Sequence, residues 1–230
     1  MIVRDAGGDV LLVTQPEHAR LARRIMAQWP PLAAEPRRDE ILLAIGHHDA
    51  GWADADAAPS VDRGTGDIVD FVGAPLAVRQ GGAPRAMAGL AHEPWAAALV
   101  AQHGLTVYGR FRGTPEWEAY FAARAQEREN LLRQCARSST MLTADYTFLR
   151  LADLISLAFC TGWTREETHD RWTVACEGTH VCVTPADAGL SIPIAVEATR
   201  LARQRFTSDA HLADAIARGT PVTLDGTLSA

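Results

Sequence analysis

Lysine is absent from this sequence of 230 residues, and all 22 of its basic residues are arginines. This absence excludes Schiff-base chemistry on a lysine amine and the lysine of a Walker-type phosphate-binding loop. Any phosphate group bound by this protein would therefore be held by arginine side chains, backbone amides or a metal ion.

Runs of basic residues are also missing. The formal net charge is −6, and the sequence pI is near 5.7. Proteins that bind nucleic acid or an anionic membrane surface usually carry a concentrated positive patch. We therefore expect neither partner, and the expected ligand is a small-molecule substrate. The sequence leaves the oligomeric state open.

Long apolar stretches and paired cysteine motifs are missing as well. The run over residues 149–162 is interrupted by Arg150 and Asp153, so it falls short of the roughly 20 apolar residues that cross a bilayer. The four cysteines show no C-x-x-C spacing, and the N-terminus lacks the basic-then-apolar pattern of a signal peptide. We expect a cytoplasmic protein with reduced thiols that does not enter a membrane.

Apolar residues make up 47% of the chain, which is enough for one sizeable buried core. Two short apolar segments around a Gly-Gly turn predict a β-hairpin within residues 1–14. Thr14 and Glu17 then form a T-x-x-E capping box, which predicts that a helix begins near residue 15. Helices are predicted over about 15–29, 38–46, 94–103, 114–137 and 141–160.

Two further features complete the prediction for the first 160 residues. Gly104 is expected to end the helix over 94–103. Residues 53–84 are rich in aspartate, glycine and proline and show little periodicity, which predicts a long covering loop.

The last quarter of the chain favours strands. Strands are predicted over about 172–176, 180–183 and 192–196, followed by a final helix over about 209–218. We expect a single domain over residues 1–230 of the α+β class, mainly α. A helical core over about 15–162 would carry a small antiparallel sheet made from the N-terminal hairpin (1–14) and the C-terminal strands (172–230).

Polar side chains lie on three of the predicted apolar helix faces. His18 shares a face with apolar residues of the first helix, and His48 and Asp49 continue the apolar stripe of the second. Asp153 stands inside the apolar segment Leu151–Leu157, where a bare buried carboxylate would cost several kcal/mol. A divalent ion held by these four side chains would offset that cost.

Two imidazoles and two carboxylates suit Zn, Mn or Fe(II), and Mg is a further candidate. Each residue also has a purely structural interpretation. His18 alone would be a satisfied core histidine, Asp49 a turn cap and Asp153 the partner of Arg150 in a buried ion pair. Their joint placement on three helices favours the metal site.

Other polar residues are weaker candidates. His92 and His103 are expected on one face of the third helix about 16 Å apart, so only one can reach the ion, and His103 is favoured. Arg110 and Arg112 could bind phosphate oxygens through bidentate guanidinium groups, although such arginines are more often solvated surface charges. His47 is expected to be a supporting or exposed residue.

The ordered motifs resemble known families. The order of His18, His48-Asp49, a further histidine and Asp153 resembles the HD superfamily of metal-dependent phosphohydrolases. A closer resemblance lies in four segments: Gln15–His18, His48–Trp52 with Asp56, Gln102–Gly104 and Leu151–Leu157. These segments look like the uncharacterised bacterial family called domain of unknown function 3891, and the resemblance covers nearly the whole chain.

This resemblance implies an HD-like helical bundle with His18, His48, Asp49 and Asp153 as metal ligands. It also implies that Asp49 can act in catalysis by bridging a second ion, and that His103 serves as acid, base or further ligand. It assigns no substrate.

Three functions are compatible with such a site. The first is hydrolysis of a small phosphate ester or nucleotide by metal-activated water, assisted by His103 and by Arg110 or Arg112. The second is a non-haem iron oxygenase on the same scaffold. The third is a non-catalytic module that binds a small metabolite.

Overall fold

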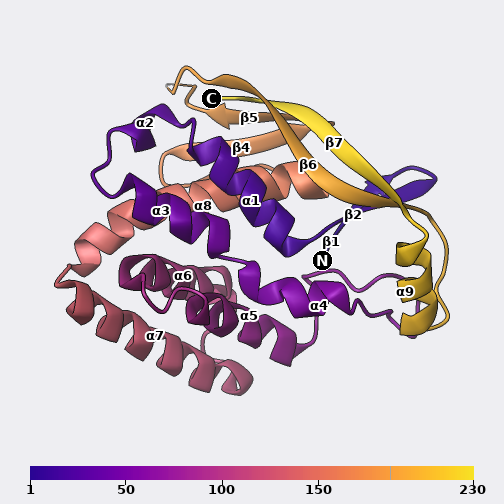
Figure 1. The fold of residues 1–230 in the computed structure, drawn as a ribbon, viewed down its shortest axis with the longest axis horizontal. Helices are drawn as coiled ribbons and strands as arrows, with labels where there is room; N and C mark the ends of the chain where they lie inside the picture. Colours follow the sequence, from indigo (N-terminus) through magenta and orange to yellow (C-terminus); the bar gives the residue numbers. More distant parts are fainter. Residues whose placement is uncertain (187) are drawn as a thin grey trace.

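The computed structural model describes residues 1–186 and 188–230, and it places a helical layer against one large twisted sheet (Figure 1). The strands are β1 (Ile2–Ala6), β2 (Asp9–Val13), β3 (Glu167–His169), β4 (Trp172–Glu177), β5 (His180–Thr184), β6 (Ser191–Ala202) and β7 (Thr220–Ser229). The helices are α1 (Gln15–Met26), α2 (Pro30–Ala33), α3 (Arg38–His47), η1 (Ala50–Trp52), α4 (Ala53–Ala57), α5 (Leu76–Ala88), α6 (Pro94–Val107), η2 (Gly109–Phe111), α7 (Pro115–Cys135), α8 (Ser139–Thr161) and α9 (Asp209–Ala217).

The sheet has seven strands in the order β1-β2-β6-β7-β5-β4-β3. Its neighbours are antiparallel except β5 and β7, which pair in parallel with Val181 opposite Leu228. The prediction of a small antiparallel sheet beside a helical bundle is therefore wrong. The N-terminal hairpin does join the C-terminal strands, through β2 and β6, as expected.

The two largest differences from the predicted sheet are in β6 and β7. β6 is a continuous strand of 12 residues, whereas only residues 192–196 were expected to be extended. β7 was not predicted at all, although Val222, Leu224 and Leu228 alternate with polar residues along it. Pro221 and Gly226 weaken that strand signal.

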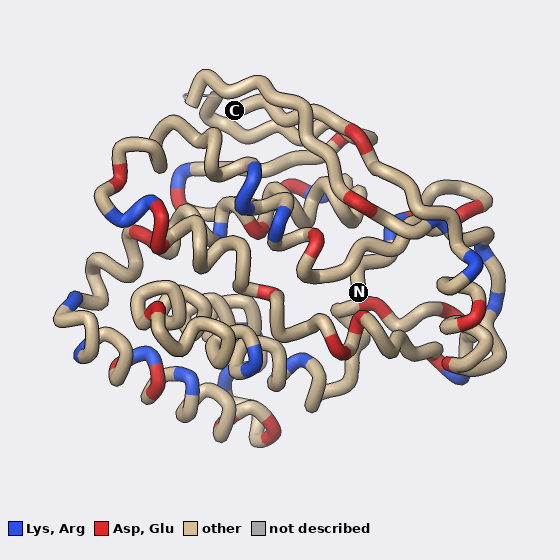
Figure 2. The backbone as a smooth tube through the Cα atoms, in the orientation of Figure 1, with Lys and Arg blue, Asp and Glu red and all other residues tan. Residues whose placement is uncertain are grey.

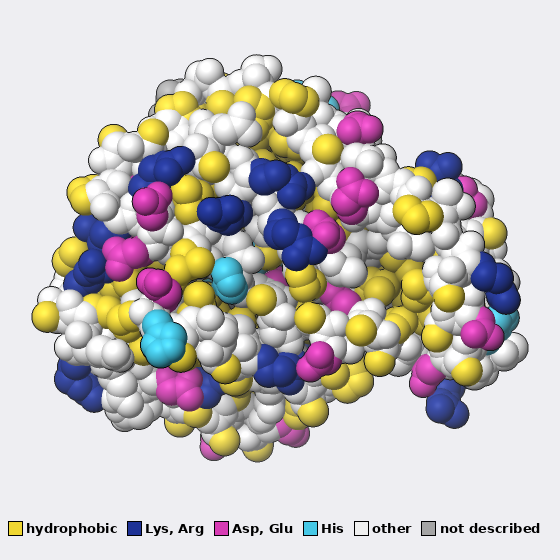
Figure 3. All heavy atoms as spheres, viewed as in Figure 1, with side chains coloured by type: hydrophobic (Ala, Val, Ile, Leu, Met, Phe, Trp, Pro, Cys, Tyr) yellow, Lys and Arg dark blue, Asp and Glu magenta, His cyan; other side chains and the backbone are white. Residues whose placement is uncertain are grey.

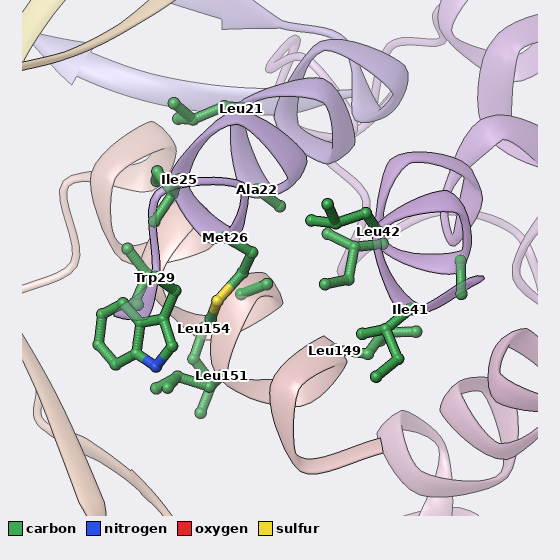
Figure 4. Packing of buried hydrophobic residues seen from close by; sticks show 14 of the residues in the cluster. Leu21, Ala22, Ile25, Met26, Trp29, Ile41, Leu42, Leu149, Leu151 and Leu154 are labelled. Carbon is green, nitrogen blue, oxygen red and sulfur yellow. The ribbon is translucent and has the colours of Figure 1, made fainter. Parts of the chain in front are cut away.

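The helix α8 lies between the sheet and the other helices. It contacts β1, β4 and β5 on one side and α1, α3 and α6 on the other. Figure 4 shows Met26 of α1, Leu42 of α3 and Leu149 of α8 in the apolar core between these helices. Because the three helices are fixed by this packing, polar side chains carried by each of them can meet at a defined point.

Most charged side chains are at least partly exposed. On α1 the residues Arg20, Arg23 and Arg24 are exposed while His18, Leu21 and Ile25 are buried, and Figure 3 shows basic side chains gathered over this helix. Basic and acidic residues are interleaved along α7 (Figure 2). Within the described residues, every helix is too short or too polar to cross a lipid bilayer.

Two helix predictions need correction. The covering loop predicted over residues 53–84 is partly helical, because it contains α4 and the beginning of α5. The helix α5 forms in spite of Gly81-Gly82 and Pro84, since it packs against η1 and α6. The helix α6 does not end at Gly104 but continues to Val107. His92 precedes α6 and is exposed, so it does not share a helix face with His103.

Candidate metal centre

Three helices bring the four predicted ligands together. His18 comes from α1, whose first turn is capped by Thr14 through a 3.2 Å hydrogen bond from the Glu17 amide. His48 and Asp49 follow the last turn of α3, and Asp153 lies in the middle of α8. One potential ligand atom from each of the four residues lies within 4.8 Å of the others.

The distances describe a tight cluster. His18 Nε2 lies 3.0 Å from His48 Nε2 and 3.4 Å from both Asp49 Oδ2 and Asp153 Oδ1. His48 Nε2 lies 3.5 Å from Asp49 Oδ2 and 3.6 Å from Asp153 Oδ1. Two imidazole nitrogens and two carboxylate oxygens therefore face one shared point.

The hydrogen bonds on the far side of each ring fix its tautomer. His48 Nδ1 lies 2.7 Å from the Ile45 carbonyl, which can only accept, so this nitrogen carries a proton. His18 Nδ1 lies 2.8 Å from the Ser156 hydroxyl, which itself donates to the Ala152 carbonyl at 2.9 Å. His18 Nδ1 is therefore the donor to Ser156, and both Nε2 atoms of the neutral rings present lone pairs to the cluster.

This donor set fits a divalent cation. Two lone pairs and two buried carboxylates repel one another unless a positive charge stands between them. Metal-binding histidines commonly coordinate through one ring nitrogen while the other donates a hydrogen bond. The Nδ1 atoms of His18 and His48 have hydrogen-bond partners of this kind. In the absence of an ion, a proton on His18 supplies the positive charge.

The pKa shifts of the clustered residues reflect burial on one side and neighbouring opposite charges on the other. Burial acts to lower the pKa of His18, but hydrogen bonds to Asp153 and Asp49 outweigh it and raise the pKa to about 9. Burial acts to raise the pKa of Asp153, yet the surrounding histidines and Arg150 hold it well below its usual value. The pKa of Asp49 is also lowered against the effect of burial, chiefly by His48 and His18. Both carboxylates are therefore ionised at neutral pH.

Arg150 and the ligand role of Asp153 are compatible. Arg150 Nη1 lies 2.5 Å from Asp153 Oδ2, whereas the other oxygen, Oδ1, faces His18 and His48. The carboxylate thus has an ion pair on one side and the cluster on the other. The structural interpretation of Asp153 and its interpretation as a ligand hold together.

His103 lies beside the cluster. Its Nε2 is 3.9 Å from Asp153 Oδ2, and its Nδ1 is 3.3 Å from the hydroxyl of buried Tyr146. Burial lowers the pKa of His103 to about 3, so the ring is neutral near pH 7. A neutral ring can donate or accept a hydrogen bond with a substrate, but it is not a general acid at that pH.

A pocket of about 330 Å³ opens onto the centre. The side chain of Asp49 is 18% exposed and that of Asp153 is 2% exposed, so Asp49 is the more accessible ligand. His103 and both aspartates line the pocket. A wall of aromatic and aliphatic residues includes Trp52, Phe71, Val72, Val107, Tyr108, Leu154, Leu157 and Trp163.

Four arginines line the same pocket: Arg79, Arg110, Arg150 and Arg165. The structure therefore brings Arg110 to the pocket but not Arg112, whose guanidinium carbon lies 4.5 Å from the centre of the Phe121 ring. His47 is half-buried and lies 3.1 Å from the Leu43 carbonyl through its Nδ1. Neither His47 nor His92 belongs to the pocket lining.

Several pocket residues were missed from the sequence. Arg79 lies in the segment that was expected to be a loop, and Trp163 and Arg165 follow α8 in an irregular segment. Ser156 belongs to the Leu151–Leu157 motif, but its contact with His18 joins residues 138 positions apart in the chain. Only the spacing of Ser156 from Asp153, three residues along one helix, indicated that both lie near one site.

Comparison with known proteins gives one result. The family described as "Protein of unknown function (DUF3891)" matches residues 1–207. No curated protein and no solved structure matches the chain.

Proposed function

The chain belongs to the DUF3891 family of proteins of unknown function, and we propose that it is a metal-dependent hydrolase of a small phosphate ester or nucleotide. The observation that carries this proposal is the position of the four-residue cluster, which opens onto a pocket lined by four arginines. Arginine is the side chain best suited to bind phosphate oxygens, since its planar fork makes paired hydrogen bonds.

His18, His48, Asp49 and Asp153 would hold the ion, and their mixed nitrogen and oxygen donors suit Zn, Mn or Fe(II). When bound, a divalent ion lowers the pKa of water and polarises a phosphoryl oxygen. The resemblance of the ligand order to the HD superfamily supports the assignment to phosphate chemistry.

The chain's own residues would position the substrate. Arg150, held by Asp153, presents its remaining N–H groups on the pocket wall next to the ligands, where they can bind the phosphoryl group. His103, neutral and oriented by Tyr146, would hydrogen bond to a substrate oxygen. The apolar wall around Phe71 and Trp163 would exclude water and contact the organic part of the ester.

Hydrolysis assays test this proposal directly. Purified protein is loaded with Mn²⁺, Zn²⁺, Fe²⁺ or Mg²⁺ and assayed against 4-nitrophenyl phosphate, bis(4-nitrophenyl) phosphate and nucleoside monophosphates. We expect phosphate release that a chelator abolishes and that falls at least about a hundredfold in Asp49→Asn. The exposed carboxylate variant Asp54→Asn should keep the wild-type rate.

Two outcomes would contradict the proposal. Oxygen consumption by the Fe²⁺ form without phosphate release would indicate the oxygenase instead, because histidine and carboxylate ligands also suit iron. A metal-loaded protein that binds phosphate compounds and turns over neither oxygen nor esters would indicate a binding module.

A further inference from the structure

Two arginines of the pocket wall have no counter-charge. The guanidinium groups of Arg79, in the first turn of α5, and of Arg110, in η2, form no ion pair and no hydrogen bond with any residue that the structure describes. The Nε atom of Arg79 is buried without a hydrogen-bond partner. By contrast, Arg150 is paired with Asp153, and Arg165 lies 2.5 Å from Glu167. The positive charge of the pocket is therefore uncompensated at Arg79 and Arg110.

Aromatic rings hold these two arginines in place. The guanidinium carbons of Arg79 and Arg110 lie 5.3 Å and 4.8 Å from the centre of the Phe111 ring. Arg79 also lies 5.7 Å from the centre of the Trp117 ring. A cation–π contact uses the face of the guanidinium plane and leaves the in-plane N–H donors available. The two guanidinium groups thus contact the ring while their donors stay unpaired.

The platform beneath them is rigid. The rings of Phe111 and Trp117 stack with centres 4.9 Å apart and planes within 3° of parallel. Trp117 is buried, and Tyr108 packs on it with ring centres 4.6 Å apart. Gln80, next to Arg79, donates to the Glu116 carbonyl at 2.7 Å and so ties α5 to the start of α7. Such a support is expected where a binding site must be preorganised.

Two like charges on one ring repel each other, and an anion between or beside them would remove that cost. Tyr108 lies on the same wall, and burial raises the pKa of its phenol, so it keeps its proton and can donate. We infer that Arg79 and Arg110 form an anion-binding subsite, separate from the metal centre, that selects substrates carrying a second anionic group.

This inference rests on the proposed function for the identity of the first anionic group, which is the phosphoryl group at the metal centre. The substrate class then becomes a phosphate ester with a second phosphate or a carboxylate in its organic part. An alternative arrangement, in which Arg79 and Arg110 clamp the reacting phosphoryl group itself, gives a different result in the test below.

The test compares two series of non-hydrolysable ligands on Mn²⁺-loaded protein by calorimetry. One series is phosphonoacetate, 3-phosphonopropionate and 4-phosphonobutyrate; the other is the n-alkyl phosphonates of matched length. At one chain length or more, the carboxylate should tighten binding about tenfold or more, as charge-assisted hydrogen bonds do. Arg79→Met and Arg110→Met should reduce that preference to less than about twofold. Arg112→Met should keep that preference, because Arg112 contacts the Phe121 ring outside the pocket lining.

Two results overturn the subsite. In the first, the carboxyalkyl phosphonates bind no more tightly than the alkyl phosphonates at any chain length. In the second, Arg79→Met and Arg110→Met weaken the binding of both series equally, which would place both arginines on the phosphonate. Arg110 is exposed, so Arg110→Met keeps the test valid if Arg79→Met fails to fold.

A metal-free arm separates this inference from the proposed function. In the presence of a chelator, sulfate should raise the Tm of wild-type protein and Arg112→Met saturably, and this effect should be lost in Arg110→Met. Equal stabilisation of all three proteins would contradict the subsite. Saturable sulfate binding to a protein that hydrolyses no ester would support the subsite and would contradict only the proposed function.

Discussion

Ser156 decides the orientation of the His18 ring. Its hydroxyl accepts a hydrogen bond from His18 Nδ1 and donates one to the Ala152 carbonyl one turn earlier in α8. The lone pair of Nε2 consequently faces His48, Asp49 and Asp153. Without this contact the buried ring could adopt the other tautomer, with a proton where the ligand lone pair is needed.

Replacing Ser156 with alanine should therefore weaken metal binding by about 10- to 100-fold. The loss arises because His18 Nδ1 would lack an acceptor. Thr143→Ala is the matched control, since Thr143 is an exposed residue of the same helix that also bonds back to a carbonyl one turn earlier. Calorimetric titration with Zn²⁺ measures both variants. Unchanged affinity in Ser156→Ala would contradict the tautomer assignment.

The raised pKa of His18 predicts how the metal-free protein responds to pH. Its pKa is about 9 in the folded state against 6.5 normally. A pKa raised on folding stabilises the protein fully below pH 6.5, and this stabilisation is lost as the pH rises through 9. In a chelator, the free energy of unfolding should fall over this range by up to about 3 kcal/mol.

Denaturant titrations at pH 6 and pH 9.5 measure this effect. His92→Gln, an exposed histidine variant, should show the same fall as wild type, and His18→Gln should show little of it. Adding Zn²⁺ at pH 7.5 should also release protons, because the ion replaces the proton of His18. A flat stability profile in wild type would refute the assignment.

The sequence was sufficient to predict that four polar residues meet, but not what surrounds them. His18, His48, Asp49 and Asp153 follow apolar helix faces, where a polar side chain needs a partner, and this pattern together with the family resemblance singled them out. Their role as metal ligands stays a prediction. Arg79 lies at the start of α5 and Arg110 in η2, where no periodic pattern marks an inward face. Their meeting on Phe111 depends on the packing of α5 against α6, which a single sequence does not specify.

At the scale of elements, small residues set how closely the helices approach. A Cβ atom at Gly51 would lie 2.0 Å from the Gly82 carbonyl oxygen, so η1 rests directly on the backbone of α5. Arg85 Nε donates to the Gly51 carbonyl at 2.7 Å and holds the same contact. This contact positions the turn that carries Asp49 and Trp52.

Gly51→Ala should consequently destabilise the fold by about 1 to 3 kcal/mol, as overpacking does, and weaken metal binding through the displacement of Asp49. Gly8→Ala is the control, because a Cβ there meets no atom within 4 Å. Thermal unfolding and Zn²⁺ titration of both variants give the two readouts. Wild-type stability and affinity in Gly51→Ala would show that the turn is not held by α5.

The same close packing explains why α6 was predicted too short. The sequence predicts a helix end at Gly104, but a Cβ there would lie 2.4 Å from the Tyr120 hydroxyl and 3.0 Å from the Ala83 Cβ. The residue is a glycine because α5, α6 and α7 meet at this point. A single sequence does not distinguish a glycine that ends a helix from a glycine that lets another helix pack closely.

At the scale of the whole molecule, the sheet supports the helix that carries Asp153 and Ser156. β7 lies fourth among the seven strands, and Leu228 on it is fully buried in the main core. The family match ends at residue 207, before α9 and β7. The stability of the whole fold therefore depends on a strand outside the matched region.

Leu228→Ala should lower the free energy of unfolding by about 2 to 5 kcal/mol, through lost burial and the cavity left behind. Thr223→Ala, on the exposed face of β7, should change it by less than about 1 kcal/mol. Urea unfolding measures both. The folded Leu228→Ala protein should still bind metal, since the four residues of the cluster lie on or next to α1, α3 and α8. A small effect of Leu228→Ala would contradict the position of β7 in the core.

The metal content of the protein tests the account most directly. Wild-type protein, Asp153→Asn and the control Asp54→Asn are purified without added metal, and elemental analysis determines the ions bound per chain. We expect at least about one equivalent of a divalent ion in wild type and Asp54→Asn, and little in folded Asp153→Asn. A wild-type protein that binds no divalent ion, even after incubation with Zn²⁺, Mn²⁺ and Fe²⁺, would contradict it.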